Sequence, residues 1–262
     1  MGGDRRLSLR PISGDNKCNP LPPRLSRRRG IRSRMPEGAV EFSRPIPLFP
    51  LPQCVLLPHA TIPLHIFEPR YRQMVNDMLD ERGLIAMARF EGTVWKQDYE
   101  GKPPLREHVC VGMIVRHQKL DDGRFHILLQ GVARGRIVEE PVHDPYRIAR
   151  IEPTEPAAPP EPELEAIRSR LECLLADPAL KTLAAVSAIH NWLSSEIPTP
   201  ALVDLAGMTV SDDDETRYHL LAEPDIHARA RWLMGQLESL QRTLHIADRF
   251  GSGKSDEGIP LN

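Results

Sequence analysis

Prolines punctuate the apolar segment from Ile46 to Val75, and they limit the possible fold more than any other feature of the chain. A proline has no backbone N–H to donate to a neighbouring strand, so the short strands between these prolines are expected to be edges, bends or strand starts. The segment therefore predicts a small, strongly bent sheet or an open barrel without a central ladder at this point. The prolines are Pro45, Pro47, Pro50, Pro52, Pro58 and Pro63.

The pattern changes from strand to helix at Glu68-Pro69. Proline suits the first turn of a helix, and an acidic residue suits its positive end. We therefore expect a helix from Glu68 to Arg82, and a strand from Leu84 to Phe90 after it. The apolar residues at helical spacing are Tyr71, Val75, Met78 and Leu79.

The sequence IPLHIFEPRYRQMV, residues 62–75, closely resembles the start of the N-terminal, substrate-recognition domain of the ATP-dependent Lon proteases. The resemblance resumes at Val111–Glu140 and at Pro145–Glu152, and a weaker likeness runs from Leu220 to Leu240. It implies an α+β fold, in which a PUA-like, partly open β-barrel precedes a C-terminal helical bundle. The likeness is to the N-terminal domain alone, which implies a stand-alone member without the ATPase and peptidase domains.

Composition divides the chain into five parts. Residues 1–44 are rich in Arg, Pro, Ser and Gly and are expected to be a disordered basic extension. The β-domain is expected at 45–153, and a proline-rich connection at 154–163 separates it from a helical bundle at 164–247. Residues 248–262 are expected to be a flexible tail.

The basic extension has three possible explanations. Translation starts at Met35, or the arginines contact nucleic acid or anionic surfaces, or the segment is an organelle presequence. Of the net charge of −2, residues 1–34 contribute +8, which leaves −10 for residues 35–262. An acidic folded part disfavours phosphate binding, so nucleic acid is expected to bind only through residues 1–34.

Asp122-Gly123 predicts a two-residue hairpin turn between two alternating runs. This turn would pair Val115 with Gln130 and Ile114 with Gly131. One face of the hairpin would fill a barrel, and the other would lie under a helix or a neighbouring domain. Met113, Val115, Leu128 and Val132 would share one face, and Ile114, Phe125, Ile127 and Leu129 would share the opposite face, with no assignment of either set to the barrel side.

After the proline-rich connection the apolar period becomes helical. The apolar stripe of the last helix predicts either a seam inside a bundle or a homodimer contact. The expected helices are Leu164–Leu175, Lys181–Ser194, Ala201–Ala206, Asp213–Leu221 and one from Asp225 to about Ile246.

Sequence motifs for catalysis and cofactors are missing or incomplete. Gly251–Ser255 resembles a phosphate loop, but its first glycine would fall at Asp248 and no strand precedes it. No Gly-x-Ser-x-Gly elbow occurs. We therefore expect a protein without enzymatic activity or cofactors, although a protease name can attach to it through the shared domain.

No metal site is expected either. The hairpin would place His117 and His126 as diagonal neighbours, but zinc needs three or four ligands. Asp212–Glu215 lacks the spacing of a calcium loop, and Ser211 with Asp214 instead predicts a capping box variant. The four cysteines have no CxxC spacing and are expected to be reduced thiols.

The motif HIFEPRYRQM allows a structural and a functional interpretation. In the first, it anchors the strand-to-helix corner and Arg70 or Arg72 pairs with acidic neighbours. In the second, the corner borders a groove between barrel and bundle, where His65, Phe67, Arg70 and Tyr71 contact extended client segments.

A polar loop from Glu91 to Glu107 holds two further candidate binding residues, Trp95 and Tyr99. The resemblance implies a non-catalytic module that binds unfolded or flexible protein segments, as an adaptor or regulator of proteolysis or as a weak holdase. A protease or ATPase partner and a homodimer are both compatible with it. The alternative is an RNA-binding PUA-like protein that uses the arginine-rich arm. A chain without a signal or membrane segment is expected in the cytoplasm.

Overall fold

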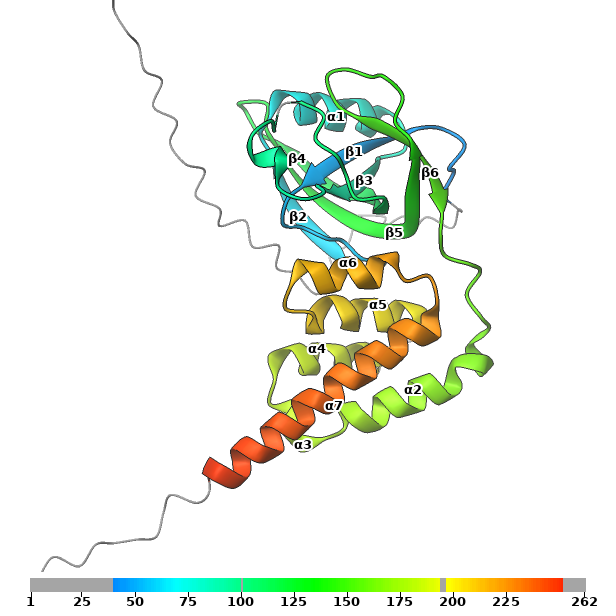
Figure 1. Cartoon of the computed structure of the whole chain (residues 1–262), viewed down its shortest axis with the longest axis vertical. Helices are drawn as coiled ribbons and strands as arrows, with labels where there is room; N and C mark the ends of the chain where they lie inside the picture. The colour runs from blue at the N-terminus through cyan, green and yellow to red at the C-terminus, as the bar shows by residue number, and fades with distance from the viewer. Residues whose placement is uncertain (1–39, 100, 194–196, 252–262) are drawn as a thin grey trace, which may run out of the picture.

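The computed structural model describes residues 40–99, 101–193 and 197–251, which form a six-stranded mixed sheet followed by a group of helices (Figure 1). The fold class is therefore α+β, as predicted. In the sheet half the elements are β1 (Ile46–Leu51), β2 (Thr61–Ile66), α1 (Pro69–Asp80), β3 (Leu84–Arg89), the 3-10 turn η1 (Val94–Lys96), β4 (His108–Lys119), β5 (Phe125–Glu139) and β6 (Ile148–Pro153). In the helical half they are α2 (Glu161–Leu175), α3 (Pro178–Lys181), α4 (Ala184–Leu193), α5 (Thr199–Val210), α6 (Asp214–Ala222) and α7 (Ile226–Gly251).

The strand pairings run in a ring, because the long strand β5 pairs with both β4 and β6. From β4 the ring continues through β3 and β1 to β6. Of the described strands, β2 pairs only with β5 and lies outside the ring as its edge strand. This partly closed sheet matches the bent, barrel-like sheet that the prolines predict.

Strand β1 differs from its expected position, because it lies between β3 and β6 and not at an edge. Its prolines are tolerated because the two pairings are offset along the strand. Leu48 N donates to Arg147 O, just before β6, at 2.8 Å. The backbone nitrogen of Pro50 faces the same side as that of Leu48, but Pro50 lies beyond Ile46 and Pro47, the residues that pair with β6, so no hydrogen bond is lost there. A proline can therefore enter a paired strand wherever a neighbour stops.

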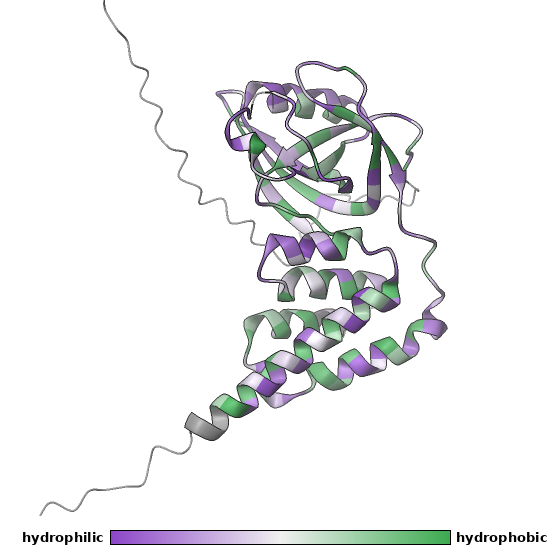
Figure 2. Cartoon of the chain, in the orientation of Figure 1, coloured by the Kyte–Doolittle hydropathy of each residue, from purple (hydrophilic) through white to green (hydrophobic). Residues whose placement is uncertain are grey.

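Two apolar layers lie on the two faces of the ring. Leu48, Ala86, Val111 and Ile151 belong to a cluster on one face. On the other face Phe49, Met87 and Cys110 join a cluster that also takes in α1, α5 and α6, so the sheet and the helices share a core. Figure 2 shows the hydrophobic colouring along the strands and the mostly hydrophilic loops around them.

The β4–β5 hairpin is offset from its predicted register. Leu120 donates to Arg124 O at 2.8 Å, and Gly123 donates to Leu120 O at 2.9 Å with φ +78°, so the loop has three residues. A glycine in the left-handed region ends such loops, and the two-residue turn was wrong. Register shifts add to the offset, and the observed pairs are Met113 with Gln130 and Ile114 with Leu129.

The predicted faces of the hairpin survive this offset. Phe125, Ile127, Leu129 and Ile114 all pack in the cluster under the helices. Met113 and Val132 pack on the opposite face. Val115 and Leu128 are the exceptions. The shift between Ile114 and Arg116 leaves Val115 unpaired and 44% exposed, and the half-buried Leu128 belongs to neither cluster.

Several helix and segment boundaries also differ from the predictions. Helix α2 begins at Glu161, since Pro160 and Pro162 suit a helix start. Helix α7 continues to Gly251, beyond the expected end near Ile246. Val40 and Phe42, which fall inside the segment assigned to the extension, pack against the sheet. Residues 1–39 and 252–262, which contain the arginine-rich arm at 1–34 and all of the Gly251–Ser255 motif except Gly251, lie outside the described residues.

The cap of α6 is Asp213 and not Ser211. The carboxylate of Asp213 accepts from Thr216 N at 2.8 Å, and hydrogen bonds to Thr216 lower its pKa. Ser211 is buried and donates to Gly207 O at 2.6 Å, which ends α5. The acidic run is thus a helix cap, as expected, with its capping residue shifted by two positions.

Four buried or half-buried charges join the sheet to the helices. Asp204 on α5 accepts two hydrogen bonds from Arg134 on β5, at 2.6 and 2.9 Å, and lies 3.1 Å from Arg229 on α7. Glu155, which follows β6, bonds the same two arginines at 3.0 and 2.5 Å. Both arginines are 1% exposed. We call Arg134, Asp204, Arg229 and Glu155 the junction cluster.

Within the described residues, no helix combines the length and apolar character needed to cross a bilayer.

Candidate functional site

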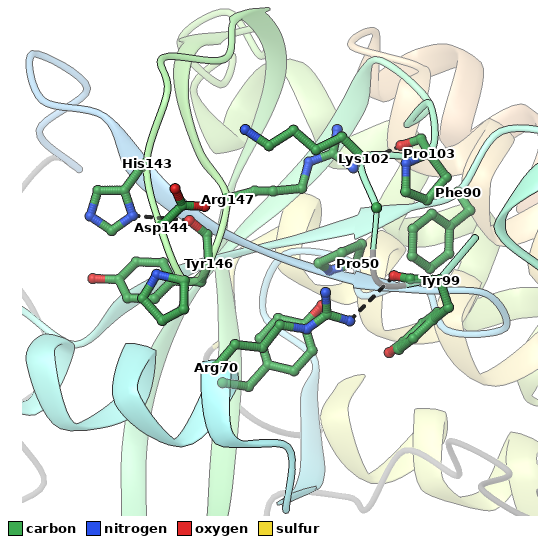
Figure 3. A pocket seen from close by; sticks show the side chains of 13 residues that line it. Pro50, Arg70, Phe90, Tyr99, Lys102, Pro103, His143, Asp144, Tyr146 and Arg147 are labelled. Atoms are coloured by element: carbon green, nitrogen blue, oxygen red, sulfur yellow. Dashed lines mark hydrogen bonds between the residues drawn. The ribbon is translucent and has the colours of Figure 1, made fainter. Parts of the chain in front are cut away.

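A small pocket lies beside the first turn of α1, where the 91–107 loop and the segment before β6 meet (Figure 3). Its volume is about 60 Å³, enough for a few waters or one short side chain. Its lining contains three cations, Arg70, Lys102 and Arg147, and one carboxylate, Asp144. The remaining lining residues are Pro50, Tyr71, Phe90, Tyr99, Gly101, Pro103, His143, Pro145 and Tyr146.

Arg70 is held in place by its neighbours on one side of the pocket. Its Nε donates to Glu68 at 3.1 Å, and its guanidinium carbon lies 4.7 Å from the ring centre of Tyr71 and 4.9 Å from that of Tyr99. The Tyr99 hydroxyl also donates to Glu68, at 2.8 Å. Glu68 therefore binds two pocket residues instead of capping α1, whose N-terminus has no side-chain cap.

Tyrosine side chains supply neutral walls to this site. Burial raises the pKa of Tyr71 to about 12. Burial and a hydrogen bond to Asp77 raise the pKa of Tyr146 to about 12. Burial, together with Tyr71 and Glu68, also raises the pKa of Tyr99. All three phenols therefore stay protonated at neutral pH and add no negative charge to the pocket.

The segment before β6 forms the opposite wall. His143 Nδ1 lies 2.9 Å from Tyr146 O across the cis peptide Asp144-Pro145. Arg147 donates to both oxygens of Glu140 at 2.8 Å and to Pro103 O at 2.7 Å, which connects this segment to the 91–107 loop. Figure 3 shows Arg70 on one side of the hollow, with Lys102 and Arg147 on the other.

The two predicted loop residues are both near this pocket. Tyr99 lines it, and its ring packs edge-on against Phe90 at 5.9 Å. Trp95 stacks on the lining residue Phe90 at 5.7 Å but is not itself part of the lining. The structure therefore brings Arg70, Tyr71 and Tyr99 together, with Trp95 supporting one wall.

His65 and Phe67 lie outside the pocket lining, at the end of β2. The exposed Phe67 ring lies 5.9 Å from the His65 ring, which in turn packs 4.9 Å from His126. His126 pairs across the strands with His65. The predicted approach of His117 to His126 was wrong, because His117 pairs with Ile127 in the observed register and so faces the other way.

Two parts of the predicted groove need correction. Tyr71 is 4% exposed and packs against Phe49 at 4.7 Å, so it supports the corner from inside and cannot meet a large client. Figure 1 places α1 at the end of the sheet domain away from α5 and α6, so the corner does not border a groove between barrel and bundle. The pairing of Arg70 with Glu68, by contrast, is as the structural interpretation expected.

Sequence reasoning missed the far wall of the pocket. Lys102, His143, Asp144 and Arg147 are separated from Arg70 by more than 30 residues, so no local spacing connects them. One signal was available, since the resemblance resumes at Pro145, inside this wall. Among the described residues, no group of three or more His, Cys, Asp or Glu side chains is arranged to hold a metal ion.

The family model of the ATP-dependent protease La (LON) substrate-binding domain matches residues 45–239. The chain is 25% identical over 228 residues to a Lon protease of Desulfosudis oleivorans, covering 85% of the chain and 26% of that protein. It is 29% identical over 230 residues to Lon protease 2 of Sorangium cellulosum, covering 81% and 27%. The chain thus spans about a quarter of the length of these relatives.

Two solved structures share the fold. A Lon N-terminal domain protein from Xanthomonas campestris superposes with a TM-score of 0.53 at 24% identity, over 73% of this chain and 98% of that one. The N-terminal domain of a Lon protease from the Mycobacterium avium complex gives a TM-score of 0.56 at 16% identity, over 74% and 98%. Both matches agree with a partly ring-like sheet joined to helices.

Proposed function

Because the chain belongs to the ATP-dependent protease La (LON) substrate-binding domain family, we propose that it is a protein-recognition module for unfolded or flexible protein segments. The observation that carries this proposal is Phe67, whose aromatic ring is 55% exposed at the corner between β2 and α1. Large exposed aromatic side chains are typical anchors at protein interfaces. Phe67 is also in the segment that most resembles the family.

The strand that precedes Phe67 suits an extended client. β2 pairs with β5 on one side and has no second strand partner among the described residues. Pro63 and His65 point outward from it while Ile62, Leu64 and Ile66 are buried, so Phe67 continues an exposed row. An extended segment can lie along such an edge and place one side chain on the aromatic ring.

The module itself would perform no chemistry in this proposal. It would deliver bound segments to a protease or an ATPase, as an adaptor or regulator of proteolysis, or delay their aggregation as a weak holdase. A homodimer would place two such corners in one particle and raise the avidity for a long client.

Binding of a reduced, carboxymethylated model protein, followed by fluorescence anisotropy, tests this function. We expect binding by the native chain and a loss of about tenfold or more in Phe67→Ser. The matched control is Val138→Ser, at a 51% exposed apolar position on β5. If the native chain does not bind, or if both variants weaken binding equally, the recognition surface is not at this corner.

A further inference from the structure

The pocket between Arg70 and Arg147 has a chemistry that the proposed function does not yet use. Its lining contains three permanent cations against the single carboxylate of Asp144. The buried residues Pro50 and Phe90 and the ring of Tyr71 provide apolar walls. A group that fits such a lining carries a negative charge and has a small apolar part next to it.

The arginines keep donors available for a ligand. Glu68 and Glu140 orient the two guanidinium groups and match their formal charges one to one, but neither glutamate lines the pocket. An arginine has five N–H donors, and hydrogen bonds within the described residues take up two on Arg70 and three on Arg147. Lys102 is exposed and makes no ion pair with another described residue.

The size of the pocket selects the end of a chain. A segment in the middle of a polypeptide would have to enter and leave a hollow of about 60 Å³, whereas a chain terminus only has to enter it. A C-terminal residue brings an α-carboxylate together with one side chain, and this combination matches the cations and the apolar walls. An amino terminus brings the wrong charge.

We propose that this pocket captures the C-terminal carboxylate of a client protein, with Arg70, Lys102 and Arg147 as the anion-binding residues. The inference rests on the proposed function and adds to it a second contact, separate from the exposed ring of Phe67. A client would then be recognised by its free end at the pocket and by an extended segment at the corner.

A pair of labelled peptides tests the assignment. One is Gly-Ser-Gly-Ser-Gly-Ser-Val with a free carboxylate, and the other is the same peptide with a C-terminal amide. We expect the free acid to bind the full chain at least tenfold more tightly than the amide, because the amide loses the charge-assisted bonds. Equal affinities, or no binding of the free acid at millimolar concentration, overturn the proposal.

Two further arms separate the alternatives. An amidated peptide with an internal glutamate reports on an acidic side chain, and if it binds as well as the free acid, the assignment to a chain terminus is wrong. Lys102→Gln is expected to weaken binding of the free-acid peptide several-fold without changing the melting temperature of the protein, whereas Lys181→Gln on α3 is expected to leave binding unchanged. If the carboxymethylated protein binds through Phe67 while the peptide pair shows no difference, this inference fails and the proposed function stands.

Discussion

Two pairs of arginines occupy opposite environments in this chain. Arg134 and Arg229 are 1% exposed in the junction cluster, between the sheet and the helices. The side chains of Arg70 and Arg147 are 21% and 14% exposed and line a pocket beside α1. All four arginines bind carboxylates, so the chemical type of the ion pair does not distinguish the junction cluster from the pocket.

The distance along the chain does distinguish them. In the pocket, Arg70 binds Glu68 two residues away and Arg147 binds Glu140 seven residues away. In the junction cluster, Arg134 binds Asp204 across 70 residues and Arg229 binds Glu155 across 74. Local pairs fix the direction of a side chain, while long-range buried pairs fix how two parts of the fold pack. The first kind leaves donors for a ligand, and the second is structural.

Removing Asp204 should produce the largest effect. Asp204→Ala leaves two buried guanidinium groups with the half-buried Glu155 as their one remaining carboxylate partner among the described residues, and we expect a loss of roughly 3–5 kcal/mol in the free energy of unfolding. Urea denaturation followed by circular dichroism measures it. The control is Glu152→Ala, which breaks an exposed pair with Arg136 and should cost about 0.5 kcal/mol or less. Similar losses of stability in the two variants would mean that the buried charges of the junction cluster contribute no more to stability than an exposed ion pair.

Two tyrosines extend the comparison to neutral groups. Tyr218 on α6 is 5% exposed and accepts from His108 N of β4 at 3.0 Å, whereas Tyr99 donates to the partly exposed Glu68. Tyr218→Phe should cost about 1–2 kcal/mol because it leaves a part-buried N–H unpaired, and Tyr99→Phe about 0.5 kcal/mol. Thermal denaturation of both variants ranks the two hydroxyls. The reverse order would mean that the hydrogen bond at the pocket contributes more to stability than the hydrogen bond between β4 and α6.

The sequence predicted the parts of the fold that depend on local patterns. Proline positions and alternating apolar residues indicated the bent sheet, and the Glu68-Pro69 boundary indicated α1. The hairpin register failed by a small offset because loop length depends on Gly123 being the third loop residue, which the Asp-Gly pair alone does not determine. A similar local ambiguity placed the α6 cap on Ser211 instead of Asp213.

Contacts between distant segments were beyond local patterns. The motif around Arg70 was identified, but its partners Lys102 and Arg147 reach it only through the ring of strands. Arg134 and Asp204 carried no signal either, since a charged residue in an apolar strand or helix reads as exposed until its partner is known. Tyr71 was assigned to binding because it is aromatic and lies in the motif, although its helical spacing already indicated a buried position.

Glu215 offers a third combination, long-range but exposed, and is expected to give the smallest effect. It binds Arg89 at 2.8 Å and Arg106 at 2.7 Å, across 126 and 109 residues, while its side chain is 51% exposed. The hydrogen bond and charge of Arg106, with the charge of Arg89, lower its pKa below the usual 4.5. A lowered pKa stabilises the fold above pH 4.5, and this contribution is lost as the pH falls through the depressed value.

Glu215→Gln should therefore cost about 0.5–1 kcal/mol at pH 7, a value reduced by solvent screening. The difference in the free energy of unfolding between the variant and the native chain should narrow as the pH is lowered below 4.5, because the native carboxylate then becomes neutral too. Urea denaturation between pH 7 and pH 3.5 follows this difference. Glu139→Gln is the control, since Glu139 and its partner Arg150 are both well exposed on neighbouring strands. If this difference in the free energy of unfolding stays constant with pH for Glu215→Gln, packing and not the charge of Glu215 stabilises the contact between α6 and the sheet.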